Sequence, residues 1–78
     1  MKVLAFGIAK DIVGGAGLHL TLAGEESVGD LRNLLNARYP RLLQLSSYLI
    51  AVNDEYAEAD VRISEQDEIA IIPPVSGG

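Results

Sequence analysis

Hydrophobic residues along the chain fall into short runs whose spacing predicts a series of small strands and helices. The apolar run at residues 3–6 is typical of a central strand covered on both faces. Apolar positions at helical spacing over residues 8–13, followed by glycine, predict a short helix. Strict alternation of leucine with polar residues then predicts a second strand over residues 17–22, with one buried and one wet face.

The main helix is predicted to begin after Ser27. The Ser27 side chain can accept a hydrogen bond from a free amide of the first turn, and Asp30 can return one to the cap residue. Gly29 weakens this helix by about 1 kcal/mol relative to alanine. Pro40 ends it. Its apolar face consists of leucines at helical spacing: Leu31, Leu34 and Leu35.

The second half of the chain predicts shorter elements. Residues 42–45 are expected to form a loop or a single turn over the end of the core. Residues 49–52 predict a third strand, and the Asn-Asp pair after them predicts a turn into a very short strand at 55–57. Ile63 lies alone among polar neighbours and is expected to anchor its loop to the core.

A final strand is predicted over residues 69–72, and the two prolines that follow cannot donate to a β-ladder, so they end it. The element order indicates an α+β fold in which one main helix packs across a mixed sheet. The two most apolar strands, at 3–6 and 69–72, are expected to be neighbours in the centre. We therefore expect one domain over residues 1–72 and a flexible tail over residues 73–78.

Composition narrows the possible functions. The 78 residues, 49% hydrophobic and 22% charged, suit one small globular domain. No apolar run approaches the roughly 18 residues that cross a bilayer, and no signal-peptide core follows Met1, so we expect a cytoplasmic protein without a membrane partner. The absence of cysteine excludes disulfides, thiolate metal sites and a thiol nucleophile.

The net charge of -5 has the wrong sign for neutralising phosphates, so nucleic acid is not an expected partner. The acids are concentrated late in the chain: residues 51–78 hold seven of them against the single basic residue Arg62. This acidic part has two interpretations, a solubilising face or a docking surface for a basic partner.

Side chains offer little catalytic chemistry. His19 stands on the wet face of its predicted strand without a nucleophile beside it. Glu55, Glu58 and Asp60 lack the pattern of a calcium loop, so no metal site is expected. The glycine-rich residues 14–17 precede a strand, which favours a turn over a phosphate cradle. The chain therefore has no evident active site of its own.

The C-terminus is the remaining candidate site. Pro73 and Pro74 favour an extended backbone that leaves the sheet, and Gly77 and Gly78 lack side chains, so this end could enter a channel too narrow for Cβ atoms. An ATP-using enzyme could convert the Gly78 carboxylate to an acyl adenylate. The alternative interpretation is an incidental flexible end.

These residues carry a family resemblance. Residues 73–78, with the acidic and apolar residues 67–72 before them, resemble the terminal signature of the small subunit of molybdopterin synthase, a β-grasp protein of the ubiquitin-like superfamily. The likeness extends over nearly the whole chain: the opening strand through Phe6, the main helix after Ser27, and Val52-Asn53 before a short strand all fall where that family has them. It departs mildly at Lys10-Asp11, where the family often has Arg-Glu, and at Gln66, where it often has glycine.

The resemblance implies a sulfur carrier. An E1-like adenylating enzyme would activate Gly78 with ATP and magnesium, and a sulfur donor protein would convert it to a thiocarboxylate. The large synthase subunit, joined with this chain in a heterotetramer, would then use that sulfur to build molybdopterin from cyclic pyranopterin monophosphate. No cofactor would be bound permanently. The residues expected to line the partner's channel are Pro73, Pro74, Val75, Ser76 and Gly77.

Phe6 and Ile72 are expected beside the tail, where they would form part of the partner interface; the alternative is that both are core residues. Two other functions stay open. One is another ubiquitin-like role, either a thiamin-type sulfur carrier or a protein modifier. The other is a plain β-grasp binding domain whose final glycines are incidental.

Overall fold

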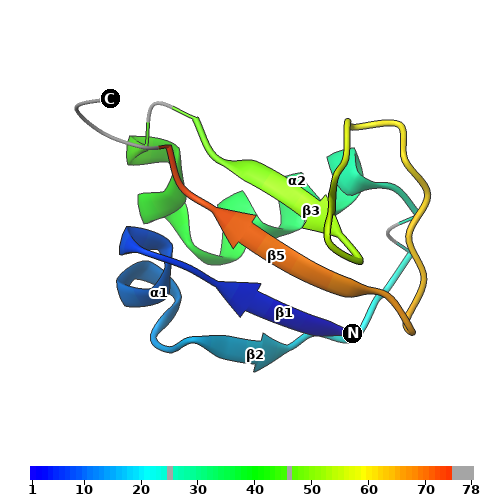
Figure 1. Cartoon of the computed structure of the whole chain (residues 1–78), viewed down its shortest axis with the longest axis horizontal. Helices are drawn as coiled ribbons and strands as arrows, with labels where there is room; N and C mark the ends of the chain where they lie inside the picture. Colours follow the sequence, from blue (N-terminus) through cyan, green and yellow to red (C-terminus); the bar gives the residue numbers. More distant parts are fainter. Residues whose placement is uncertain (25, 46, 75–78) are drawn as a thin grey trace.

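Five strands form one mixed sheet in the computed structural model, which describes residues 1–24, 26–45 and 47–74 (Figure 1). Their order across the sheet is β2-β1-β5-β3-β4. The elements are β1 (Lys2–Ala5), α1 (Ile8–Val13), β2 (Gly17–His19), α2 (Val28–Arg38), the 3-10 helix η1 (Pro40–Gln44), β3 (Leu49–Val52), β4 (Glu55–Tyr56) and β5 (Glu68–Ile72).

The two most apolar strands, β1 and β5, are parallel neighbours in the middle of the sheet, as the sequence predicted. Val3 pairs with Ile69 and Ala5 with Ile71. On its other side β5 is antiparallel to β3, with Ile50 opposite Ile71. Parallel pairing of the first and last strands makes β1 and β5 end at the same edge of the sheet (Figure 1).

The main helix α2 begins as predicted, with one correction. The Ser27 hydroxyl accepts a hydrogen bond from the Asp30 amide at 3.2 Å. The Asp30 carboxylate, however, accepts from the amide of Glu26 at 3.1 Å and not from that of Ser27. Ser27 has an extended backbone and forms an antiparallel bridge to Arg62. In this conformation the Glu26 amide is the donor to the Asp30 carboxylate.

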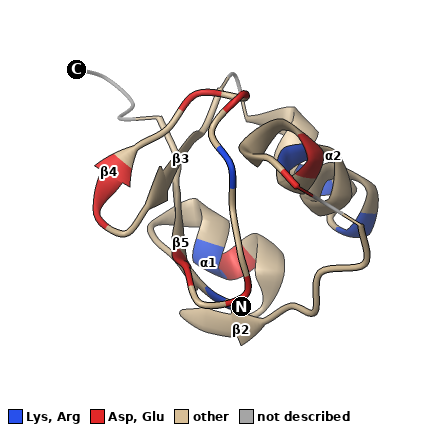
Figure 2. Ribbon diagram, turned by 90° about the vertical axis from the view of Figure 1, so that its right-hand side faces the viewer, with Lys and Arg blue, Asp and Glu red and all other residues tan. Residues whose placement is uncertain are grey.

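The core lies between one face of the sheet and α2, which Figure 2 shows on one side of β3 and β5. Leu42 of η1 is fully buried and covers the end of this core, as the predicted turn required. Ile63 is half-buried against the core and anchors its loop. The other fully buried large side chains are Val3, Val28, Leu31, Leu35, Ile50, Ile69 and Ile71.

The prediction that the central strands are covered on both faces is wrong. In β1 and β5 burial alternates: Val3, Ile69 and Ile71 are buried against the helix, whereas Leu4 and Ala70 are only half-buried. A strand lined with apolar residues on both faces gives the same sequence pattern whether its second face is covered by the chain itself or left open. Here that second face is open.

Smaller differences concern the edge strands. β2 ends at His19 and not at residue 22, because β1 starts at Lys2 and the hydrogen bonds between the two segments end with those that Met1 and Leu20 exchange. β4 covers residues 55–56, one fewer than predicted, although the Ala57 amide still donates to Ile50. The turn before β4 forms as expected, with positive φ at both of its central residues.

A polar cluster that could not be expected from the sequence joins α2 to the start of β3. The Tyr48 hydroxyl donates to Asn36 Oδ1 at 2.6 Å, and an Arg32 guanidinium nitrogen donates to the Tyr48 carbonyl at 2.9 Å. The guanidinium also lies over the Tyr48 ring, 4.5 Å from its centre. Burial raises the pKa of the Tyr48 hydroxyl, an effect that Arg32 partly opposes.

Candidate functional site

The candidate site lies at the end of the sheet where the central strand β5 finishes. Ile72 is the last residue of β5 and pairs with Leu49 of β3. On the other side the Phe6 amide donates to the Ile71 carbonyl at 3.2 Å, one residue beyond the end of β1. Pro73 is half-buried and Pro74 is exposed. The chain therefore leaves the sheet from its centre, with a neighbouring segment on each side (Figure 1).

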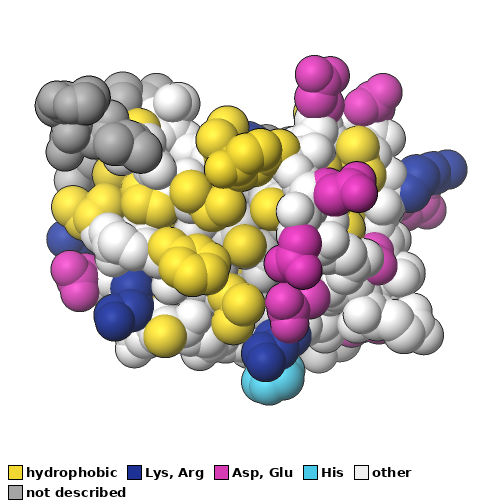
Figure 3. Space-filling view, viewed as in Figure 1, with side chains coloured by type: hydrophobic (Ala, Val, Ile, Leu, Met, Phe, Trp, Pro, Cys, Tyr) yellow, Lys and Arg dark blue, Asp and Glu magenta, His cyan; other side chains and the backbone are white. Residues whose placement is uncertain are grey.

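Beside this exit, the open face of the sheet carries a shallow apolar depression of about 270 Å³, which we call the outer hollow. Figure 3 shows hydrophobic side chains gathered over this face. Successive strands contribute because paired residues point to the same side of a sheet. The lining residues are Leu4, Phe6, Ala51, Asp54, Tyr56, Glu68, Ala70 and Ile72.

The structure brings together the two residues expected at the partner interface. Phe6 is 50% exposed and Ile72 is half-buried, and both line the outer hollow. The alternative that they belong to the buried core is therefore wrong. Two further exposed apolar side chains on this face, Leu49 and Tyr56, were missed. For Leu49 the available signal was its alternation with buried Ile50, because period two in a strand separates its faces.

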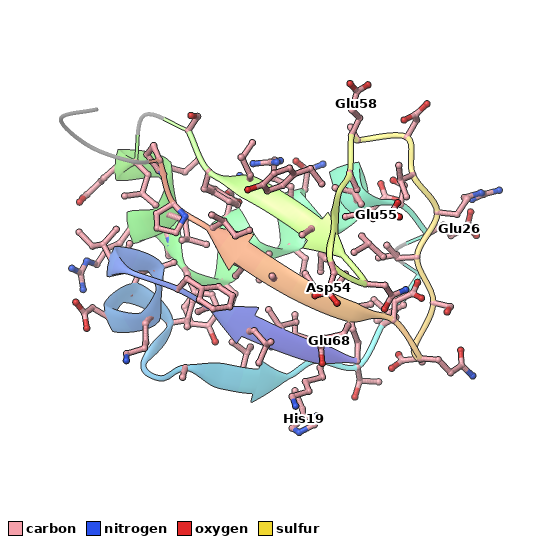
Figure 4. The ribbon with its side chains drawn as sticks, in the orientation of Figure 1. His19, Glu26, Asp54, Glu55, Glu58 and Glu68 are labelled. Carbon is pink, nitrogen blue, oxygen red and sulfur yellow. The ribbon has the colours of Figure 1, made fainter. Side chains whose placement is uncertain are left out.

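Acidic residues border the outer hollow on one side. Asp54, in the turn between β3 and β4, and Glu68, at the start of β5, belong to its lining. Figure 4 shows both on the open side of the sheet, and Figure 2 shows acids on β4 and in the loop after it. The hollow thus combines an apolar floor with negative charge, which suits a partner surface that is apolar and basic.

Other acids of the second half have internal partners. Glu65 accepts hydrogen bonds from the Met1 ammonium at 2.9 Å and from the Leu22 amide at 2.6 Å, and these donors lower the pKa of its carboxyl. The pKa of Asp67 is lowered chiefly by the Asn53 side chain and then by the Ser64 amide. These two acids therefore stabilise loops, which separates them from the acids at the hollow.

In the part of the chain that the structure describes, conventional catalytic groups do not gather where β5 ends. His19 is exposed on β2, two strands away from β5. Within residues 1–24, 26–45 and 47–74, no three His, Asp or Glu side chains are placed to hold a metal ion. The same residues include no helix long and apolar enough to span a bilayer. The expected channel residues Val75, Ser76 and Gly77, and the expected reacting residue Gly78, lie outside the described residues.

Comparison with known proteins identifies the family. The model of the ThiS family matches residues 3–78. The chain belongs to the ThiS family. A curated relative from Dictyostelium discoideum, a molybdopterin synthase sulfur carrier subunit, is 41% identical over 99% of this chain and 94% of its own length. The protein of the same name from Arabidopsis thaliana is 33% identical, covering 100% and 82%. These matches confirm the resemblance to the small synthase subunit.

Solved structures confirm the β-grasp fold. A putative molybdopterin converting factor subunit 1 from Pyrococcus furiosus superposes with a TM-score of 0.84 at 23% identity, covering 95% of each chain. Small archaeal modifier protein 1 from Methanosarcina acetivorans gives 0.80 at 27% identity, covering 99% and 94%. A complex of subunits 1 and 2 of the molybdopterin-converting factor from Helicobacter pylori matches at 0.67 and 23% identity, covering 99% and 96%.

Proposed function

We propose that this chain is a sulfur carrier that delivers sulfur, as a thiocarboxylate on Gly78, to cyclic pyranopterin monophosphate in molybdenum cofactor biosynthesis. The observation that carries the proposal is the exit of the chain from the central strand β5 through Pro73 and Pro74, directly beside the outer hollow. Full-length relatives named molybdopterin synthase sulfur carrier subunit support the recipient pathway.

The chemistry needs no catalytic side chain from this chain. The Gly78 carboxylate oxygen attacks the α-phosphate of ATP, and magnesium-bound pyrophosphate leaves, which gives an acyl adenylate. Sulfide from a donor then attacks the carbonyl carbon: a C–S bond forms, the C–O bond to AMP breaks, and the thiocarboxylate remains. Both steps occur in the active site of an adenylating enzyme, so the role of this chain is to dock and to present its terminus.

The outer hollow is the docking surface in this proposal. An adenylating enzyme and the large synthase subunit would each cover Phe6 and Ile72, because these residues lie beside the exit of the tail. The complex of subunits 1 and 2 from Helicobacter pylori supports the large-subunit partner. Sharing one surface makes the two partners mutually exclusive, so the carrier dissociates between charging and delivery.

Asp54 and Glu68 give this docking an electrostatic component. Both line the hollow, and a partner with Lys or Arg at the matching positions would be steered toward it. The contribution is chiefly to the association rate and falls as salt is added.

The decisive experiment is the intact mass of the C-terminal fragment after incubation with an adenylating enzyme, ATP, magnesium and sodium sulfide. Exchange of one oxygen for sulfur at Gly78 supports the carrier function, and conversion of cyclic pyranopterin monophosphate by the charged chain with the large subunit supports the pathway. An unmodified terminus despite an active enzyme would contradict the proposal.

Two variants control this experiment. Deletion of Gly78, or addition of one alanine after it, should abolish charging and leave the melting temperature close to that of the wild type, since the buried core of the described residues ends at Ile71. If the chain with the added alanine functions as well as the wild type, a free Gly78 carboxylate is not required. That result would favour the plain binding domain, in which the final glycines are incidental.

A second candidate, a protein modifier, is favoured by the likeness to small archaeal modifier protein 1. Its distinguishing product is an adduct that joins Gly78 to a lysine of another protein. Peptide mapping of the charged mixture in the presence of a lysate separates it from the thiocarboxylate.

A further inference from the structure

Gly7 and Pro73 lie next to each other where β5 ends and the tail begins. Gly7 connects β1 to α1 and has φ 54° and ψ -136°, a conformation that residues with a side chain rarely adopt. A Cβ at Gly7 would lie 3.0 Å from Pro73 Cγ and 3.9 Å from Pro73 Cδ. The space that a side chain would need at position 7 is therefore adjacent to the proline ring.

The neighbouring bonds hold both residues of this pair in place. The Phe6 amide donates to the Ile71 carbonyl, which joins the segment before Gly7 to the end of β5. The Gly7 carbonyl accepts from the Lys10 amide at 3.1 Å, which joins Gly7 to the first turn of α1. Pro73 itself has a fixed φ. Because its ring lies beside Gly7, Pro73 has little freedom to turn in another direction.

We propose that Gly7 is a positioning residue of the carrier: it forms a seat for Pro73 that fixes the direction in which the tail leaves the sheet. The inference rests on the proposed function and deepens it. On this proposal the adenylating enzyme receives the tail in one direction. Because Gly78 lies five residues beyond Pro73, a small displacement of Pro73 would cause a larger displacement of the reacting carboxylate.

A purely structural role for Gly7 is the competing explanation, because any alanine at a positive φ is strained. Gly14 and Gly24 provide matched controls. Both have positive φ, at 88° and 108°, and a Cβ at either position would meet no heavy atom of the described residues within 4 Å. Alanine at these two positions introduces backbone strain without reaching Pro73.

The test compares Gly7→Ala, Gly14→Ala and Gly24→Ala in charging by an adenylating enzyme with ATP, magnesium and sodium sulfide. Each should lower the melting temperature, by roughly 5–15 °C, so rates are measured well below all transitions and corrected for the folded fraction. Gly7→Ala alone should lower kcat/KM, by about tenfold. The loss should fall on kcat, since the outer hollow that sets docking is unchanged.

A double-mutant cycle with Pro73→Ala separates the seat from backbone strain. Without the proline ring, Gly7→Ala has nothing to displace, so its effect on kcat should shrink to less than about twofold. An equal loss in both backgrounds, or a loss matching that of Gly14→Ala, overturns the proposal.

A readout independent of charging keeps the two proposals distinguishable. In proton–nitrogen NMR spectra of the free carrier, Gly7→Ala should shift the Val75 amide, the first after the two prolines, and Gly14→Ala should not. An unmoved Val75 amide overturns the seat even if the wild type is charged. A wild type that is never charged while the Val75 shift is observed overturns the carrier function and leaves the seat as a feature of the fold.

Discussion

The Met1 ammonium and the Glu65 carboxylate form an ion pair at 2.9 Å, which joins the start of β1 to the loop that precedes β5. The ammonium also donates to the Leu20 carbonyl at 2.8 Å, and the second Glu65 oxygen accepts from the Leu22 amide. One carboxylate thus joins the beginning of the sheet, the segment after β2 and the loop before the strand that carries the tail.

Stability should therefore fall in acid through Glu65. The pKa of Glu65 is lowered in the folded state by the Met1 ammonium and then by the Leu22 amide. A lowered folded pKa means that the stabilisation is complete above the unfolded value of about 4.3 and is lost as the pH falls through the folded value. Melting temperatures measured from neutral pH down to about pH 3 should show this loss, and Glu65→Gln should flatten it.

Glu58→Gln is the matched control, because it removes the same charge from an exposed position in the loop after β4. Its acid profile should keep the slope of the wild type. Asp67, whose pKa is lowered in the same direction by Asn53 and Ser64, contributes the slope that remains in Glu65→Gln. A profile of Glu65→Gln that matches the wild type would contradict the role of the ion pair.

The hydroxyl of Tyr48 should contribute measurably to stability. Tyr48→Phe removes the 2.6 Å bond to Asn36 Oδ1 and leaves that half-buried acceptor without its donor. We expect a loss of about 1 kcal/mol in the free energy of unfolding, measured by urea denaturation with an unchanged m-value. Tyr56→Phe, at an exposed hydroxyl on the outer face, should change it by less than about 0.5 kcal/mol.

Much of the fold followed from local pattern. The bounds of α1 and the cap at Ser27 are properties of short segments, so spacing and capping chemistry were enough to find them. The central pairing of β1 with β5 followed from their shared apolar character. The bonds of Glu65 and Tyr48 were not predictable, because each joins residues more than ten positions apart in the chain.

The candidate site was predictable only in part. The sequence indicated Phe6, Ile72 and the two prolines, but it could not show that the second face of the sheet is open. A run of apolar residues reports hydrophobic character at both faces and says nothing about what covers them. The proximity of Gly7 to Pro73 could not be predicted either, because it depends on where the ends of β1 and β5 lie in three dimensions.

Gly29→Ala should fail to stabilise the main helix. In an ordinary helix this change gains about 1 kcal/mol. Here the Gly29 amide donates to the Ala59 carbonyl at 2.9 Å, and a Cβ at Gly29 would lie 3.3 Å from both that oxygen and the Ala59 Cβ. We expect a net loss of about 1 kcal/mol by urea denaturation, because the loop must move away.

Asn33→Ala is the comparison for this prediction, since Asn33 is exposed on the same helix. It should gain a few tenths of a kcal/mol, roughly the difference in helix propensity. A gain of similar size for Gly29→Ala would show that the loop at Ala59 adapts without cost.

Phe6 should carry partner binding and little stability. Phe6→Ala removes an aromatic side chain that is 50% exposed at the outer hollow. Leu43→Ala removes an aliphatic side chain that is 66% exposed on η1, away from the hollow. Both should change the free energy of unfolding by less than about 1 kcal/mol, because neither residue belongs to the buried core. Phe6→Ala alone should weaken binding to the large synthase subunit, by about 2 kcal/mol or roughly thirtyfold in Kd.

Calorimetric titration of the large subunit with each variant measures this difference directly. Buried aromatic side chains dominate interfaces when partner groups surround them and exclude water, and the floor formed by Leu4, Ala70 and Ile72 provides one side of such a pocket. Equal affinities for Phe6→Ala and Leu43→Ala would place the large subunit elsewhere on the carrier. The proposed exclusion between the two partners would then lose its basis, because a shared hollow is the reason that they compete.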